Sequence, residues 1–161
     1  MKTLKIFIAS SEELKLERLA LNSLIIRMNK VLKKHDIRLE PEMWEMLDAS
    51  MGPLHKQEEY NLALRTCDVC LVLFWNRFGD FTAEEFNVAY EATRNGGMPR
   101  HLYVVFKRSN NMAAELNTFQ NSLSQSYNQA SNTVGTTEEL CRLFARQMSE
   151  LLQIGEIALV K

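Results

Sequence analysis

Residues 68–75 read Asp-Val-Cys-Leu-Val-Leu-Phe-Trp, and this nearly continuous apolar run decides the fold class. An unbroken apolar run is typical of a central parallel strand that is covered on both faces, whereas a strand with one face in water alternates polar and apolar residues. The loop Asn76–Phe81 follows, with Gly79 inside it, and then a predicted helix over Thr82–Asn95 that ends at Gly96–Gly97. We therefore predict a buried strand whose carboxyl end leads directly into a loop and a helix.

Strands and helices alternate on both sides of this unit. Runs of apolar and β-branched residues predict strands at Leu4–Ala9, Ile37–Met43 and His101–Phe106, and a short strand at Ser126–Ala130 would complete a sheet of five. Helical spacing of apolar residues predicts helices from Ser10 to Lys33–His35, at Leu54–Arg65, at Met112–Leu123 and at Thr136–Leu152. Ser10 with Glu13 and Thr136 with Glu139 form capping boxes at the start of the first and the last of these helices. This alternation predicts an α/β fold, with a parallel sheet between two layers of helices.

Length and composition limit the class of protein. The 161 residues suit a single domain, 1–161, and the net charge of −1 argues against nucleic-acid binding through bulk charge. No run approaches the roughly 18 apolar residues of a transmembrane helix. Three cysteines without a secretory signal predict free thiols and a cytoplasmic location. The closing stretch Ile154–Val160 reads as a last strand or as the start of a connection, in which case the domain would be the N-terminal part of a longer chain.

Glu85 is the main candidate for chemistry. With Glu85 set at zero on a helical wheel, Ala89 lies at about 40°, Ala92 at about −20° and Val88 at about −60°. We therefore expect Glu85 in the middle of the apolar stripe, in the first turn of its helix. In parallel α/β sheets, ligands bind outside the carboxyl ends of the strands. A carboxylate at that edge is suited to acid–base chemistry or to stabilising a carbocation.

The same glutamate also has a purely structural interpretation. Thr82 and Glu85 form the pattern T-x-x-E, in which the glutamate side chain bonds the main-chain amide of the N-cap residue. An acidic residue in the first turn also interacts favourably with the helix dipole. Helical geometry alone leaves the cap and the functional site equally open.

Four further side chains lie near predicted strand ends. The hydroxyls of Ser10 and Ser11, at a helix N-terminus, could hold a phosphate or ribose oxygen, although plain N-capping is the commoner role of such residues. Trp44 and Trp75 could stack on a base or a nicotinamide ring, and packing is again the commoner role.

Metal and thiol chemistry are not favoured by the spacing of the candidate ligands. Cys67 and Cys70 form a C-x-x-C pattern, but the pair leads into a strand, whereas redox pairs of the thioredoxin type sit at a helix N-terminus. No second pair of cysteines or histidines completes a zinc site, and His35, His55 and His101 have no metal-ligand spacing. We expect structural cysteines and no metal.

Three stretches carry a family resemblance: KIFIASSEELKLER at 5–18, CDVCLVLFW at 67–75 and RFGDFTAEEFNVAY at 77–90. Together they resemble the bacterial TIR (Toll/interleukin-1 receptor) and TIR-like domains, from roughly Leu4 to Ala92. The resemblance implies a flavodoxin-like fold. It also implies hydrolysis of NAD at the nicotinamide–ribose bond, or cyclisation of the product, often in antiviral defence or signalling.

The resemblance places Glu85 on the catalytic glutamate of a W-C-x-x-E-L motif, with Phe81 and Thr82 where that motif has tryptophan and cysteine. Nucleoside deoxyribosyltransferases have a similar T-x-x-E-x-x-x-A stretch and also cleave an N-glycosidic bond. NAD is then a substrate, and no cofactor is implied. The residues that would surround it are Ser10, Ser11, Trp44, Trp75, Arg77, Phe78, Gly79 and Thr82.

Three functions stay open on this basis. The first is an NAD-consuming enzyme gated by self-assembly into a homo-oligomer through TIR–TIR contacts, with a fused or separate sensor. The second is a non-catalytic TIR scaffold in which Glu85 is a helix cap. The third is a deoxyribosyltransferase-like enzyme or a nucleotide-sensing domain. None of the three needs direct contact with nucleic acid or a membrane.

Overall fold

The computed structural model describes residues 1–43, 53–78, 83–127 and 129–154. Its five strands are β1 (Lys2–Ser10), β2 (Ile37–Met43), β3 (Val69–Phe74), β4 (His101–Lys107) and β5 (Ser131–Val134). Its helices are α1 (Lys15–Leu32), α2 (Pro53–Thr66), α3 (Ala83–Arg94), α4 (Ala114–Gln125) and α5 (Thr137–Leu152), with 3₁₀ turns η1 (Glu12–Leu14) and η2 (Lys33–His35).

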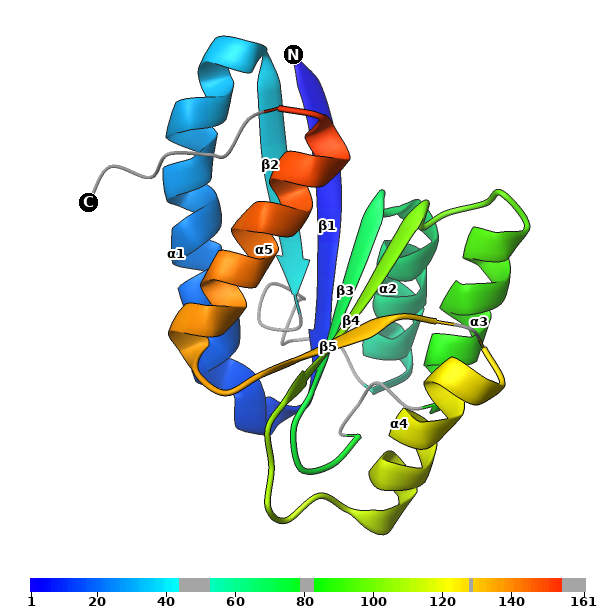
Figure 1. Ribbon diagram of the computed structural model, residues 1–161. Coiled ribbons are helices and arrows are strands. Elements are labelled where there is room, and N and C mark those ends of the chain that lie inside the picture. The colour runs from blue at the N-terminus through cyan, green and yellow to red at the C-terminus, as the bar shows by residue number, and fades with distance from the viewer. Residues whose placement is uncertain (44–52, 79–82, 128, 155–161) are drawn as a thin grey trace.

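The strands form one sheet in the order β2-β1-β3-β4-β5, and every neighbouring pair is parallel. Figure 1 shows α1 and α5 on one face of this sheet and α2, α3 and α4 on the other. This strand order and layering are those of a flavodoxin-like α/β fold, so the predicted fold class is confirmed.

Strand β3 lies in the middle of the sheet, and all six of its residues are buried. Val69, Leu71 and Leu73 pack into the core on the α1 and α5 side. Cys70, Val72 and Phe74 pack into the core on the α2, α3 and α4 side. Two separate cores meet at this strand, which explains why its sequence has no polar face.

Two predicted helix boundaries are confirmed by local hydrogen bonds. At the start of α5, the Thr136 hydroxyl accepts the Glu139 amide at 3.1 Å, and the Glu139 carboxylate accepts the Gly135 amide at 2.8 Å. After α3, Gly96 has a φ of 79°, in the left-handed region that favours glycine, and the Gly97 amide reaches the Ala92 carbonyl at 2.8 Å.

The prediction of a short strand at Ser126–Ala130 was wrong. Helix α4 continues to Gln125, the Ser126 amide still donates to the Ser122 carbonyl, and the strand is formed by Ser131–Val134. Three of the four β5 residues are exposed, because β5 is an edge strand paired only with Val104–Lys107 of β4. Its polar composition therefore gives no strand signal. The stretch Ile154–Val160, expected as a last strand or as the start of a connection, lies largely outside the described residues.

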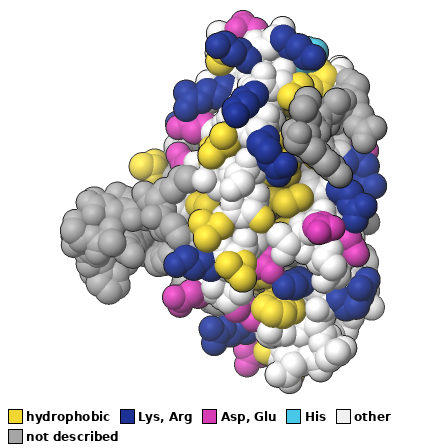
Figure 2. Space-filling view, turned by 90° about the vertical axis from the view of Figure 1, so that its left-hand side faces the viewer, with side chains coloured by type: hydrophobic (Ala, Val, Ile, Leu, Met, Phe, Trp, Pro, Cys, Tyr) yellow, Lys and Arg dark blue, Asp and Glu magenta, His cyan; other side chains and the backbone are white. Residues whose placement is uncertain are grey.

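The outward surface of α1 carries apolar side chains. Leu16, Leu19 and Ile26 are 75%, 45% and 55% exposed. Figure 2 views this side of the molecule and shows hydrophobic side chains spread among charged ones. Of the helices in the described part of the chain, none is long and apolar enough to cross a membrane.

Candidate functional site

The strand order reverses between β1 and β3, because the chain moves from β1 to β2 on one side and returns to β3 on the other. In flavodoxin-like folds this switch point, at the carboxyl ends of the strands, is where ligands bind. The segments found there are Ser11–Leu14 after β1, Trp75–Phe78 after β3 and Arg108–Ala113 after β4.

Glu13 joins the first two of these segments. Its carboxylate accepts hydrogen bonds from the Ser11 hydroxyl at 2.8 Å and from the Asn76 side-chain amide at 2.9 Å. It also accepts the main-chain amides of Asn76 at 3.3 Å and Arg77 at 3.1 Å. The sequence indicates only a capping role for Glu13, because its partners on the β3 loop are 63 and 64 residues away.

The β3 and β4 loops are joined in turn through Asn76. The Ser109 hydroxyl donates to the Asn76 side-chain carbonyl, and the Ala113 amide donates to the Asn76 main-chain carbonyl at 2.6 Å. The Trp75 indole donates to the Arg108 carbonyl at 3.2 Å. Three loops at the switch point are therefore held together by polar contacts.

Ser10 and Ser11 lie at this edge as expected, but both are buried and both hydroxyls have protein partners. Ser10 accepts a hydrogen bond from the buried Arg18, which also donates to the Ser11 carbonyl. The expected capping box of Ser10 and Glu13 was wrong: Ser10 ends β1, Ser11 is the N-cap of η1, and Ser11 makes no side-chain cap bond.

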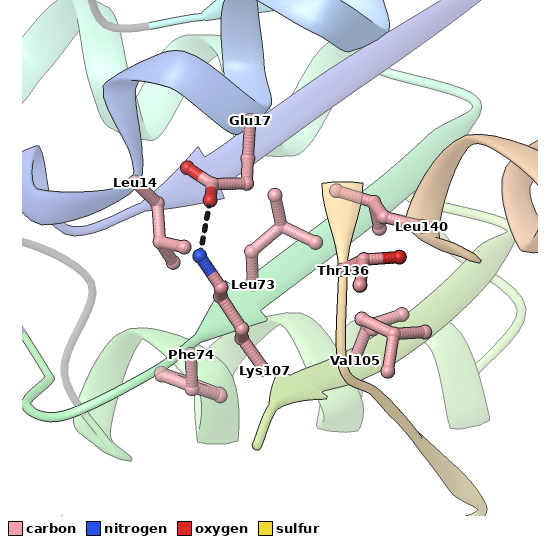
Figure 3. Close-up of a pocket in the computed structure, with 9 residues that line it drawn as sticks. Leu14, Glu17, Leu73, Phe74, Val105, Lys107, Thr136 and Leu140 are labelled. Carbon is pink, nitrogen blue, oxygen red and sulfur yellow. Dashed lines mark hydrogen bonds and ion pairs between the residues drawn. The ribbon is translucent and has the colours of Figure 1, made fainter. Parts of the chain in front are cut away.

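A partly buried ion pair lies beside this network. The Glu17 carboxylate, from α1, meets the Lys107 ammonium, at the end of β4, at 2.7 Å. Figure 3 shows the two side chains pointing toward each other beside Leu73. Lys107 also lies 4.0 Å from the centre of the Trp75 ring, so Trp75 already stacks on a cation of the protein. The cavity beside the pair holds about 10 Å³, roughly the space of one water molecule.

Glu85 lies in the first turn of α3, at the same edge of the sheet, and is half-buried. The expectation that it occupies the middle of the apolar stripe was wrong. Phe86, Ala89 and Tyr90 form the buried face, and Val88 is 57% exposed. The large aromatic side chains take the middle of the interface, so Glu85 lies at its margin, nearer to solvent.

Of the remaining candidate site residues, two are described by the structure and three are not. Arg77 is exposed, and its main-chain amide binds Glu13. Phe78 packs edge-to-face on Phe74 and Phe119, with ring centres 5.7 and 5.3 Å apart. Trp44, Gly79 and Thr82 lie outside the described residues, and so does the proposed cap bond between Thr82 and Glu85.

All three cysteines are free thiols, as expected. Burial raises the pKa of Cys67 to about 12 and that of Cys70 well above its usual value, so neither thiol supplies a reactive thiolate. Among the side chains that the structure describes, no group of three His, Cys, Asp or Glu could hold a metal ion.

This burial predicts an order of thiol labelling. In native protein at pH 7.5, a maleimide should label the half-buried Cys141 first, and Cys67 and Cys70 at least about 100-fold more slowly, because they react only after local opening. Mass spectrometry of peptides with and without urea measures the order. Rapid native labelling of Cys67 or Cys70 would contradict the structure.

Comparison with known proteins finds no family model that matches the chain and no matching curated protein. Among solved structures, the chain is similar to rubredoxin oxygen:oxidoreductase from the anaerobe Desulfovibrio gigas, with a TM-score of 0.47 and 8% sequence identity. The match covers 95% of this chain and 36% of that protein, so the chain spans little more than a third of its length. Similarity at this level carries no functional argument.

Proposed function

We propose that this protein cleaves the nicotinamide–ribose bond of NAD, with Glu85 as the catalytic carboxylate. The observation that supports the proposal best is the place of Glu85: half-buried, in the first turn of α3, at the carboxyl edge of the sheet. The position at the margin of the α3 interface leaves this side chain closer to solvent than a core residue would be. The motif resemblance at residues 81–86 supports the same residue.

Cleavage of this bond requires few groups from the protein. The ring nitrogen of nicotinamide is cationic, so when its bond to C1′ breaks, the bonding electrons leave a neutral nicotinamide. Positive charge then develops on C1′ and the ring oxygen of the ribose. A carboxylate held close to that charge stabilises the transition state, and the attacking water loses its proton to solvent.

Incubation of the purified protein with NAD tests this function. Nicotinamide release is expected, and it should be followed by chromatography at low and high protein concentrations, because assembly is proposed to gate activity. No nicotinamide from either dilute or concentrated protein would exclude NAD cleavage by this chain.

A second candidate, a self-associating scaffold, is favoured by the outer surface of α1. With Leu21 set at 0°, the exposed Leu16, Leu19 and Ile26 lie about 140° to 160° away, opposite the buried face of the helix. We propose that a second copy of the chain covers this stripe. If two α1 helices pack antiparallel through their outer faces and cross at the level of Leu21, Leu16 of one copy lies beside Ile26 of the other.

Charge supports the same pairing. In that arrangement Glu12, in the turn before α1, lies beside Lys30 of the other copy, at both ends of the contact. Two apolar pairs and two ion pairs are repeated by the two-fold axis, as a symmetric dimer requires. The contact is small, so we expect a weak dimer that forms at high protein concentration.

Substitution of Leu16 by glutamate is expected to abolish this dimer. The control is Leu62→Glu, because Leu62 is a similarly exposed leucine, 54% accessible, on α2. Sedimentation velocity over a hundredfold range of concentration measures the outcome. Identical behaviour of the Leu16 and Leu62 variants, or no self-association at all, would remove α1 as the interface.

A further inference from the structure

Glu13 receives an unusual number of hydrogen bonds for a half-buried side chain. Four donors point at its two oxygens: the Ser11 hydroxyl, the Asn76 side-chain amide and the consecutive main-chain amides of Asn76 and Arg77. Donors from two loops, far apart in the sequence, therefore surround one carboxylate.

This donor set suits a phosphate group. Consecutive main-chain amides of a turn, with a hydroxyl and a side-chain amide beside them, form the kind of concave site that binds phosphate oxygens. Positive charge is close by, because the buried Arg18 donates to the Ser11 carbonyl. The donors also lie at the β1–β3 switch point, where a ligand of this fold would bind.

We propose that these four donors form a phosphate-binding site, and that Glu13 fills it until a phosphorylated ligand displaces the carboxylate. Glu13 is thus an internal substitute for the ligand. The proposal rests on the proposed function only for the identity of that ligand, which would be the diphosphate of NAD. The site itself requires no catalysis at Glu85.

The position of Glu13 allows it to leave. Glu13 belongs to a three-residue 3₁₀ turn and is partly exposed, so its side chain can rotate into solvent. Glu17, one turn further on, differs: it is 5% exposed and paired with Lys107. When Glu13 leaves, a phosphate replaces it as the acceptor of the same four hydrogen bonds, so no donor remains unpaired.

Titration with inorganic pyrophosphate, followed by calorimetry, tests the site directly. Glu13→Ala removes the competing carboxylate and is expected to bind pyrophosphate at least about tenfold more tightly than the unmodified protein. The control is Glu138→Ala, which removes the same charge from an exposed glutamate in the first turn of α5, and should leave the affinity unchanged. An equal gain in both variants would mean a general charge effect and would overturn the proposal.

A second substitution checks where the pyrophosphate binds. In the Glu13→Ala background, Asn76→Asp removes one donor and adds a negative charge, and should abolish the gained affinity. If folded Glu13→Ala protein shows no gain over the unmodified protein, Glu13 is only a link between two loops and the proposal fails.

A measurement on the unmodified protein covers the case in which Glu13→Ala does not fold. Pyrophosphate at millimolar concentration should shift the amide NMR signals of Asn76 and Arg77 in a saturable way, more strongly in Glu13→Gln, which retains an acceptor oxygen but lacks the charge. Unchanged signals would reject the site. None of these readouts needs NAD cleavage, so failure of the proposed enzyme activity would be seen separately.

Discussion

Replacement of Glu85 by glutamine is expected to lower nicotinamide release from NAD by at least about 100-fold, the usual effect of removing one group that stabilises developing charge. Glutamine keeps the size and polarity of the side chain but lacks the negative charge that stabilises the cationic ribose. Binding of NAD should change much less, because the positive charge develops only as the bond to nicotinamide breaks.

The matched control is Glu91→Gln, six residues further along the same helix and exposed to solvent. This variant should retain full activity. Circular dichroism and thermal unfolding should show that both variants fold like the unmodified protein. If Glu85→Gln releases nicotinamide at the unmodified rate, Glu85 is a structural residue and another group must carry the chemistry.

Replacement of Lys107 by methionine is expected to lower the free energy of unfolding by about 3 kcal/mol, because it leaves the Glu17 carboxylate buried without its counter-ion. This figure is at the low end for a broken buried pair, since the Lys107 side chain is 22% exposed and water can partly reach the site. The change also removes the cation from the face of Trp75.

A double substitution separates the lost charge from the lost packing. Glu17→Gln with Lys107→Met should recover most of the stability, because no uncompensated charge remains buried. The control is Lys33→Met, which changes an exposed lysine in η2 and should alter stability by less than about 0.5 kcal/mol. Urea unfolding measures all four proteins, and a loss no larger in Lys107→Met than in Lys33→Met would show that the ion pair contributes nothing.

The position of Glu85 along the chain could be predicted from the sequence, but the direction in which it faces could not. Its first-turn position at the carboxyl edge follows from the strand–loop–helix order, which the sequence pattern predicts. The rotation of Glu85 about the helix axis cannot be predicted in this way, because the apolar residues of α3 do not all face the core. Phe86 and Tyr90 are buried, whereas Val88 is exposed. The packing of the Phe86 ring on Phe119 and of the Tyr90 ring on Tyr127 sets how α3 is rotated about its axis.

The sequence by itself determined the features that depend on neighbours in the chain. The unbroken apolar run at 68–75 indicated a strand between two helical layers, and Thr136 with Glu139 marked the start of α5, because these signals act within a few residues. Tertiary structure alone decided the contacts of Glu13 with Asn76 and of Glu17 with Lys107, whose partners lie 63 and 90 residues apart. Such pairs form only when the sheet brings distant loops together, and a single sequence carries no local trace of them.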